Sequence, residues 1–313
     1  MKIVFMGTPE FSVPCLAALC DAGYEVIGVF TQPDRPKGRG NKLQPSPVKA
    51  EAVRRGIPVF QPEKIRRDGL EDLKALQPDL CVTAAFGQIL SQEVLDVPPM
   101  GNINVHASLL PKHRGSAPIA WAIMSGDRKA GVTTMMMDRG IDTGDMLLKA
   151  ETEILEGETC GELTERLSRI GAELLLKTVR AMEAGTLERV KQNEEEMTYD
   201  PMLKKEMGVP GWEDEAAAVA GRVNGLNPWP GVTVPWKDGR MKLLRAVVCE
   251  GSGEPGTVLK ADRKAGLVVA CGQGAVRLAQ VQIPGGKPMR AEDLLLGHPI
   301  AVGTMLKEET DHA

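Results

Sequence analysis

Short apolar runs alternate with helical segments through the first half of the chain, and this alternation limits the possible folds more than any other feature. Residues 3–6 form an apolar run that ends at Gly7. Thr8-Pro9-Glu10 follows, with the N-cap, first-turn proline and acidic residue typical of a helix start. Strands separated by helices indicate βαβ units and a parallel sheet, which binds ligands at the carboxyl ends of its strands. The further runs predict strands at 25–30, 80–85, 102–106, 131–137 and 146–150.

The second half of the chain changes from this pattern to shorter apolar runs. Apolar residues recur at helical spacing from 157 to 185, which predicts an amphipathic helix that closes the first domain. The segment 186–210 is polar and irregular, as a linker would be. Beyond it, short apolar runs separated by turn residues predict a small β-barrel. We therefore predict a first domain at 1–189, a linker at 190–206 and a second domain at 207–313.

Composition excludes several classes of protein. The 313 residues carry a formal net charge of −4 and only 4% aromatic residues, so neither a uniformly basic surface nor a base-stacking surface for nucleic acid is expected. The six cysteines form no CxxC pair, which argues against a zinc site. We find no secretory signal and no apolar window long enough to span a membrane. The sequence therefore predicts a cytoplasmic protein with reduced thiols, no membrane association and no metal.

Polar side chains share one face of the predicted strand 102–106. At a period of two residues, Asn102, Asn104 and His106 face one side, and the apolar residues between them face the other. The Asn104 amide can donate hydrogen bonds to a developing oxyanion, and the His106 imidazole can transfer protons near neutral pH. The alternative is a network of buried polar groups that satisfy one another without a catalytic role.

A glycine-rich loop, Asp138-Arg139-Gly140-Ile141-Asp142-Thr143-Gly144-Asp145, follows the predicted strand 131–137. Its glycines permit a tight turn whose backbone can approach a ligand. Asp142 can orient His106, whereas the alternative is an ordinary turn rich in Asp and Gly. The turn at Gly7 lacks the further glycines of a dinucleotide fingerprint, and no GxxxxGK occurs. These absences disfavour nicotinamide enzymes and P-loop ATPases.

A basic stretch runs from residue 35 to residue 50 without an acidic residue, and it contains two glycines that make it flexible. Such a loop can bind the phosphates of a nucleic acid without having a fixed structure beforehand. The alternative is a solvated surface loop. Its cations are Arg35, Lys37, Arg39, Lys42 and Lys49.

Four separated segments have distinctive sequences: TQPDRPKGRG at 31–40, SLLPKHRGSAP at 108–118, GIDTGDM at 140–146 and NPWPG at 227–231. Together they resemble the motifs of the methionyl-tRNA formyltransferases, in the same order and over essentially the whole chain. One departure is visible. The family commonly has an acidic residue before the tryptophan that opens the second domain, and this chain has Gly211 before Trp212.

The resemblance implies a Rossmann-like parallel-sheet formyltransferase domain, followed by a small OB-like β-barrel domain that binds tRNA. It implies 10-formyltetrahydrofolate as co-substrate, no metal, and initiator methionyl-tRNA as the partner of an enzyme expected to be a monomer. The residues that match the family's catalytic trio are Asn104, His106 and Asp142. Those that match its folate contacts are Phe86, Gly87, Gln88, Ile89, Leu90, Ser108, Leu109, Leu110 and Pro111. Those that match its tRNA-binding loop are Arg35, Lys37, Arg39 and Lys42.

The activity that the resemblance implies is formyl transfer to the amino group of methionine on initiator methionyl-tRNA, for the initiation of translation. Asn104 and protonated His106 would hold the charge on the formyl oxygen, and Asp142 would orient the imidazole. The alternatives are a folate-dependent formyltransferase for a small amine (a sugar nucleotide or glycinamide ribonucleotide), a hydrolase that releases formate, and a non-catalytic RNA-binding protein. The last of these gives no reason for Asn104 and His106 to share a strand face.

Overall fold

The computed structural model describes residues 1–37, 42–237 and 239–307, and the chain divides into two compact units. The second unit takes in two stretches of the predicted first domain, while the predicted bounds of 1–189, 190–206 and 207–313 stay a prediction. The first unit comprises Met1–Gly115, Gly131–Thr152 and Thr164–Tyr199. The second comprises Ser116–Ala130, Glu153–Leu163 and Asp200–Ala313.

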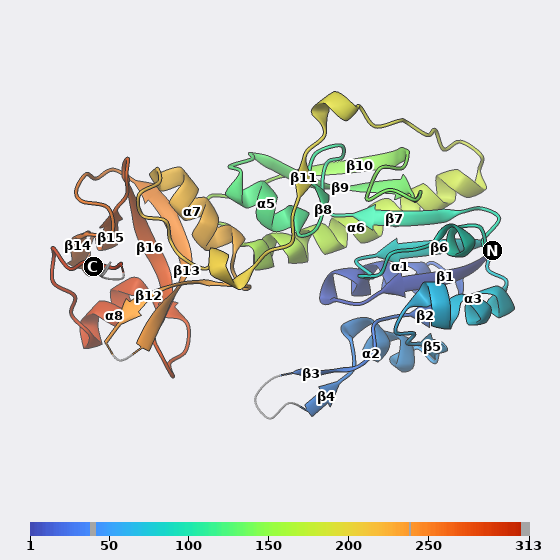
Figure 1. The fold of residues 1–313 in the computed structure, drawn as a ribbon, viewed down its shortest axis with the longest axis horizontal. Coiled ribbons are helices and arrows are strands. Elements are labelled where there is room, and N and C mark those ends of the chain that lie inside the picture. The colour runs from blue at the N-terminus through green and yellow to red at the C-terminus, as the bar shows by residue number, and fades with distance from the viewer. Residues whose placement is uncertain (38–41, 238, 308–313) are drawn as a thin grey trace. The chain divides into compact units, whose positions relative to one another are not determined.

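Within the described residues, a sheet of seven strands runs through the first unit (Figure 1). In spatial order the strands are β10 (Met146–Glu153), β9 (Lys129–Met136), β7 (Asn102–His106), β6 (Leu80–Ala84), β1 (Lys2–Gly7), β2 (Glu25–Phe30) and β5 (Val59–Phe60). The pairs that join β7, β6, β1, β2 and β5 are parallel. Strands β1 and β6 are buried on both faces, as central parallel strands are expected to be.

Strand β9 runs in the opposite direction to the parallel strands of this sheet. Strand β9 pairs with β7 antiparallel, and Thr133 lies opposite His106. The chain enters β9 beside the carboxyl end of β7. Strand β9 therefore runs back toward the amino end of β7. The loop after β9 therefore begins at the amino end of β7, where the Met137 backbone N–H donates to the Asn102 carbonyl at 2.8 Å.

Helix α6 (Cys160–Glu183) covers one face of the sheet and confirms the amphipathic helix predicted at 157–185. A side chain in place of Gly171 would meet the Val105 side chain, so the α6 backbone lies directly against β7. The Thr134 and Thr178 hydroxyls, 2.8 Å apart, join α6 to the neighbouring strand β9 in the same way.

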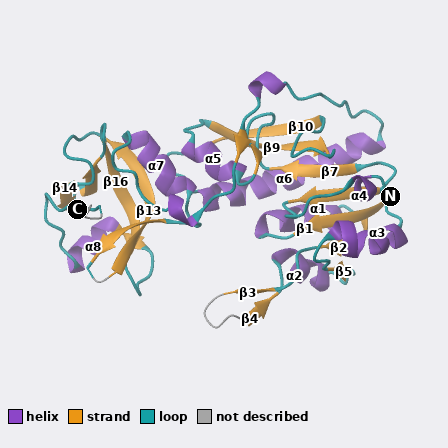
Figure 2. Ribbon diagram, in the orientation of Figure 1, coloured by secondary structure: helices purple, strands orange, loops and turns teal. Residues whose placement is uncertain are grey.

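The opposite face of the sheet is covered by α3 (Leu70–Leu76) and α4 (Gln92–Leu95), whose residues Leu73 and Val94 share an apolar core with Met6 of β1. Figure 2 shows these elements as helices beside the strands. The other elements with residues in this unit are η1 (Glu10–Ser12), α1 (Val13–Asp21), β3 (Arg35–Lys37), β4 (Lys42–Gln44), α2 (Pro47–Arg54), η2 (Ile65–Gly69), β8 (Arg114–Gly115), η3 (Glu194–Glu196) and β11 (Tyr199–Asp200).

The second unit contains an antiparallel sheet in the spatial order β12 (Val232–Trp236), β13 (Gly239–Cys249), β16 (Ala275–Gln282), β15 (Gly266–Ala270) and β14 (Val258–Asp262), with β17 (Met289–Arg290) paired to β16. Its helices are α5 (Pro118–Met124), η4 (Lys205–Met207), α7 (Ala216–Gly225) and α8 (Ala291–Gly297). Val223 of α7 and Leu294 of α8 are buried with the inward side chains of the strands in one core. The predicted fold class, a Rossmann-like α/β domain followed by a small β domain, is thereby confirmed, with the second domain seen as a sheet of antiparallel strands; its closure into an OB-like barrel stays a prediction.

Candidate active site

Strand β7 holds Asn104 and His106 on the face of the sheet that points away from α6. Because Val105 contacts α6, the pleat turns the side chains before and after it to the opposite face. Both polar side chains are buried, with 9% of Asn104 and 6% of His106 exposed. This confirms the predicted strand at 102–106 and the shared face of its polar residues.

Each ring nitrogen of His106 faces an oxygen atom. Nε2 lies 2.9 Å from the His113 carbonyl oxygen, which accepts its hydrogen bond. Nδ1 lies 3.6 Å from Oδ1 of Asp142, an ion-pair distance somewhat longer than a hydrogen bond. Both oxygens can accept a hydrogen bond from the ring, so the two contacts fix its orientation in the site.

Asp142 reaches His106 because the loop after β9 runs back alongside β7. Its backbone is left-handed, with φ at 55°, a conformation that Asp adopts more readily than most residues. Oδ2 of Asp142 accepts a hydrogen bond from the Gly115 N–H at 2.9 Å, which fixes the carboxylate beside the ring. Farther along the loop, a Cβ atom on Gly144 would overlap the Met136 carbonyl, so the return of the chain requires glycine there.

Asn104 differs from the other polar groups of the site because its side-chain amide makes no hydrogen bond within the described residues. Within residues 1–37, 42–237 and 239–307, no hydrogen bond to its amide is found, although its neighbour Asn102 donates to the Leu95 carbonyl at 2.8 Å. The Asn104 amide is nevertheless accessible enough to meet a ligand, since it retains some exposure. Two N–H donors therefore remain free to stabilise charge on a bound carbonyl oxygen.

The predicted folate loop 86–90 follows β6 and is anchored by its own polar groups. The Gln88 side chain hydrogen-bonds the backbone at both ends of 62–65, at 2.6 Å and 3.0 Å. The Gly87 carbonyl accepts from the Gln32 amide at 3.1 Å. Ile89, in contrast, is 73% exposed and offers an apolar surface at the loop. The loop residues buried in the core are Phe86 and Leu90.

The predicted folate segment 108–111 follows β7, and side chains of β9 and β10 hydrogen-bond to its backbone. Thr133 bridges it, because its hydroxyl donates to the Ser108 carbonyl at 2.7 Å and accepts from the Leu110 N–H at 3.1 Å. The Lys149 ammonium group donates to the Leu110 carbonyl, and desolvation lowers the pKa of this lysine. The side chain of Leu110 is fully buried, Pro111 is buried as well, and Leu109 lies against Gly131. Hydrogen bonds from β9 and β10 therefore hold the backbone of this segment in place.

The predicted tRNA-binding residues lie on and around a small hairpin. Strands β3 and β4 pair antiparallel, and Arg35 and Lys42 are exposed. Lys37 is the last residue of β3, while Arg39 lies outside the described residues. The fifth cation of the basic stretch, Lys49, forms an ion pair of 2.6 Å with Asp34 and so has a partner within the protein.

Other kinds of site are less well supported by the described part of the chain. In it, no three His, Cys, Asp or Glu side chains gather as metal ligands would, and no helix is long and apolar enough to cross a membrane. Burial raises the pKa of Cys15 to about 12, so this thiol is a poor nucleophile.

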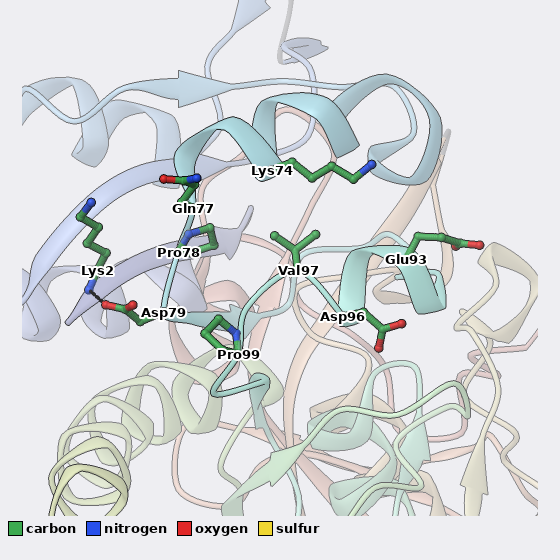
Figure 3. A pocket seen from close by; sticks show the side chains of 9 residues that line it. All are labelled: Lys2, Lys74, Gln77, Pro78, Asp79, Glu93, Asp96, Val97 and Pro99. Carbon is green, nitrogen blue, oxygen red and sulfur yellow. Dashed lines mark hydrogen bonds between the residues drawn. The ribbon is translucent and has the colours of Figure 1, made fainter.

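A hollow of about 690 Å³ lies at the amino ends of β1 and β6 (Figure 3). Its wall includes Asp79, whose carboxylate accepts a hydrogen bond from the Lys2 backbone N–H at 2.6 Å. Because β6 and β7 are parallel, this hollow is at the opposite end of the sheet from His106. It is therefore separate from the candidate active site.

Two side chains that bond to the candidate site were not expected from the sequence. Gln192 donates to the backbone of the Asp142 loop, and Lys149 holds the segment 108–111. Gln192 lies in the segment predicted as a linker, whose polar composition gave no sign of this contact. Lys149 occupies an ordinary position of strand β10, where no sequence pattern sets it apart.

Two family models match the chain and cover most of it. The model described as formyl transferase matches residues 1–179, and the model described as formyl transferase, C-terminal domain, matches 202–299. Among solved structures, an N-formyltransferase from Helicobacter canadensis is 17% identical, with a TM-score of 0.69 over 88% of this chain and 97% of that one. HypX from Aquifex aeolicus is 19% identical, with a TM-score of 0.62 over 94% of this chain and 47% of that one. At these identities the structures show a shared fold.

Curated relatives are much more similar and match from end to end. The methionyl-tRNA formyltransferase of Trichlorobacter lovleyi is 48% identical over 97% of this chain and 96% of its own length. That of Geotalea daltonii is 51% identical over 98% of both chains. The resemblance inferred from the four motifs is confirmed, and the chain belongs to the methionyl-tRNA formyltransferase family.

Proposed function

We propose that this chain transfers the formyl group of 10-formyltetrahydrofolate to the free amino group of methionine on initiator methionyl-tRNA, for the initiation of translation. The observation that carries the proposal is the uncommitted Asn104 amide on the same strand face as His106, whose ring lies 3.6 Å from Asp142. This is the arrangement that acyl transfer needs: a donor for the developing oxyanion beside an oriented acid–base group.

In the proposed mechanism, the methionine amine attacks the formyl carbon directly. Asn104 donates to the formyl oxygen as negative charge develops there, and His106 moves a proton between the attacking amine and the folate nitrogen that leaves. Asp142 orients the imidazole at Nδ1, and during the transfer Nε2 exchanges its contact with the His113 carbonyl for the substrate. The new carbon–nitrogen bond replaces the old one, and one proton passes from the amine to the leaving nitrogen. The products are formylmethionyl-tRNA and tetrahydrofolate.

We place the folate at the loops that follow β6 and β7, which are 86–90 and 108–111. Their internal hydrogen bonds make them rigid, which lowers the entropic cost of ordering a ligand. Ile89 is 73% exposed and Ile141, next to the catalytic aspartate, is 52% exposed. Exposed apolar side chains on the loop 86–90 and beside Asp142 suit a flat heterocyclic ring.

We place part of the tRNA contact at the hairpin that carries Arg35, Lys37 and Lys42, together with Arg39 and the second domain. A hairpin rich in cations can contact phosphates without using bases, which agrees with the small number of aromatic residues. The proposal further includes a monomeric, metal-independent enzyme of the cytoplasm.

A small amine is the rival acceptor, because the sugar N-formyltransferases share this fold. Their identity to this chain is 15–17%, against 48–51% for the methionyl-tRNA formyltransferases. The deciding experiment offers the protein labelled 10-formyltetrahydrofolate with methionyl-tRNA, free methionine or an amino-sugar nucleotide. We expect transfer to methionyl-tRNA alone. Equal transfer to the sugar amine, or release of formate without any acceptor, would overturn the proposal.

A further inference from the structure

The side chain of Gln192 bonds to the backbone of the loop that carries Asp142. Its Nε2 atom donates to the Asp142 carbonyl at 2.7 Å and to the Gly144 carbonyl at 2.8 Å. Its Oε1 atom accepts from Nε of Arg114 at 2.9 Å. Both amide hydrogens and the amide oxygen are therefore engaged, which fixes the Gln192 side chain in one orientation.

Arg114 supports Gln192 from a buried position. Only 3% of Arg114 is exposed, and its two terminal nitrogens bond both carboxylate oxygens of Glu194 at 3.0 Å and 2.7 Å. These hydrogen bonds also lower the pKa of the Glu194 carboxyl group. A bidentate pair of this kind has a defined geometry, so it fixes the guanidinium plane that Gln192 contacts.

The residues around Arg114 touch the other side of the catalytic pair. The His113 carbonyl accepts from His106, and the Gly115 N–H donates to Asp142, both at 2.9 Å. This strand is tied to the same distant segment, because the His113 N–H donates to the Thr198 hydroxyl at 2.7 Å and the Arg114 N–H to the Thr198 carbonyl at 2.9 Å. The segment 192–198 therefore anchors both supports of the His106–Asp142 pair.

We propose that Gln192 is a positioning residue for the reaction, supported by Arg114, and that it holds the Asp142 loop at its working distance from His106. Such a support matters because the Asp142 backbone is left-handed, a conformation that costs free energy even for Asp unless its surroundings enforce it. The inference rests on the proposed function. It also gives the segment predicted as a linker a direct part in the active site.

The first test compares Gln192→Ala with Asn193→Ala, a matched control in the same segment. The Asn193 side chain accepts from the Glu195 N–H at 3.1 Å and bonds within its own turn, so the control perturbs the segment and spares the loop. We expect Gln192→Ala to lower kcat by about 10- to 100-fold, because small displacements of catalytic groups have effects of this size. The KM values of Gln192→Ala should stay within about twofold of the wild type. The kcat of Asn193→Ala should also stay within about twofold of the wild type.

The second test separates positioning from general stability. In a protein that already carries Asp142→Asn, the catalytic carboxylate is gone, so Gln192→Ala should lower kcat by less than about threefold further. If Gln192 only stabilised the fold, Gln192→Ala would lower kcat by the same factor in the Asp142→Asn protein as in the wild type. An equal factor in both proteins, or a Gln192→Ala protein with near-normal kcat, overturns the inference.

The third test does not depend on activity and so stands apart from the proposed function. The bond to Asp142 should protect the Gly115 amide from hydrogen exchange, and displacement of the loop should break that bond. We expect Gln192→Ala to speed exchange at Gly115 by about tenfold or more, and Asn193→Ala to leave it unchanged. Unchanged exchange in Gln192→Ala would refute the positioning role, whereas a wild type without transfer activity would refute the proposed function alone.

Discussion

Replacing Asn104 with Ala is the most direct test of the candidate site. The Asn104 side chain is 9% exposed, and its amide makes no hydrogen bond within the described part of the chain. Its removal therefore breaks no hydrogen bond of the free protein. What disappears is a donor that acts when charge develops on the formyl oxygen.

The expected size of the effect follows from this difference. Loss of one preorganised oxyanion donor typically lowers kcat by about 10²–10³, or about 2.7–4 kcal/mol of transition-state stabilisation. The free energy of unfolding should change little, because no partner is left unsatisfied, and Tm should stay within about 2 °C of the wild type. Folate binding should remain, since the ground-state carbonyl depends less on this donor.

Asn102→Ala is the matched control, two residues earlier on the same strand face. Asn102 is 2% exposed and donates to the Leu95 carbonyl at 2.8 Å. Its loss should lower the free energy of unfolding by about 1 kcal/mol. This cost is small for a buried hydrogen bond, because the substitution also removes Oδ1 of Asn102, which has no partner among the described groups. A change of this size lowers Tm by about 2–4 °C, while kcat should stay within about twofold.

The assay is single-turnover formyl transfer to methionyl-tRNA, with thermal unfolding of the same samples. The two variants should separate, so that Asn104→Ala loses rate and Asn102→Ala loses stability. If Asn104→Ala keeps a near-normal rate, or melts as early as Asn102→Ala, the amide is structural and the oxyanion argument is wrong.

Further predictions concern the proposed folate segment, the hairpin and a surface carboxylate. Lys149→Met should raise the KM for 10-formyltetrahydrofolate more than it lowers kcat in steady-state assays, because the segment 108–111 loses an anchor; a change in kcat alone would contradict this. Arg35→Ala with Lys42→Ala should flatten the salt dependence of tRNA binding in a filter-binding titration by about one unit of slope for each phosphate that the variant no longer neutralises. Equal salt slopes in the wild type and the double variant would indicate that the hairpin is a solvated surface element without a role in tRNA binding. The hydrogen bond from Arg54 is the largest cause that lowers the pKa of Glu51 from 4.5 to about 2, so ionised Glu51 stabilises the fold above pH 4.5 and this contribution is lost as pH falls toward 2. Glu51→Gln should therefore be less stable than the wild type in urea at pH 7, with a difference that closes between pH 4.5 and about 2; a constant difference would refute it.

Part of the site could be predicted from sequence because it depends on a local rule. The pleat of a strand alternates its side chains, so the pattern at 102–106 fixes which residues share a face with His106. The apolar period at 157–185 likewise predicted α6, whose backbone lies against Val105. Rules of this kind need only neighbouring residues, and they hold wherever one face is buried.

The position of Asp142 depends on a property that is not local. A parallel β9 would have placed the start of the following loop beside the carboxyl end of β7, but β9 is antiparallel to β7. The loop consequently starts at the end of β7 away from His106 and has to return along the strand. Strand direction depends on where the intervening chain re-enters the sheet, and the apolar pattern of β9 is the same for either direction.

The support of the His106–Asp142 pair could not be predicted from sequence, for a further physical reason. A buried arginine such as Arg114 must have a partner, but the chain offers 42 acidic residues and no periodicity to choose among them. The structure selects Glu194, 80 positions away, in a segment whose polarity had indicated a solvated linker. Polarity there reflects partners within the protein as much as contact with water. The spacing from Gln192 to Thr198 is accordingly set by two anchor points on 113–115, so contacts with the candidate active site constrain this stretch.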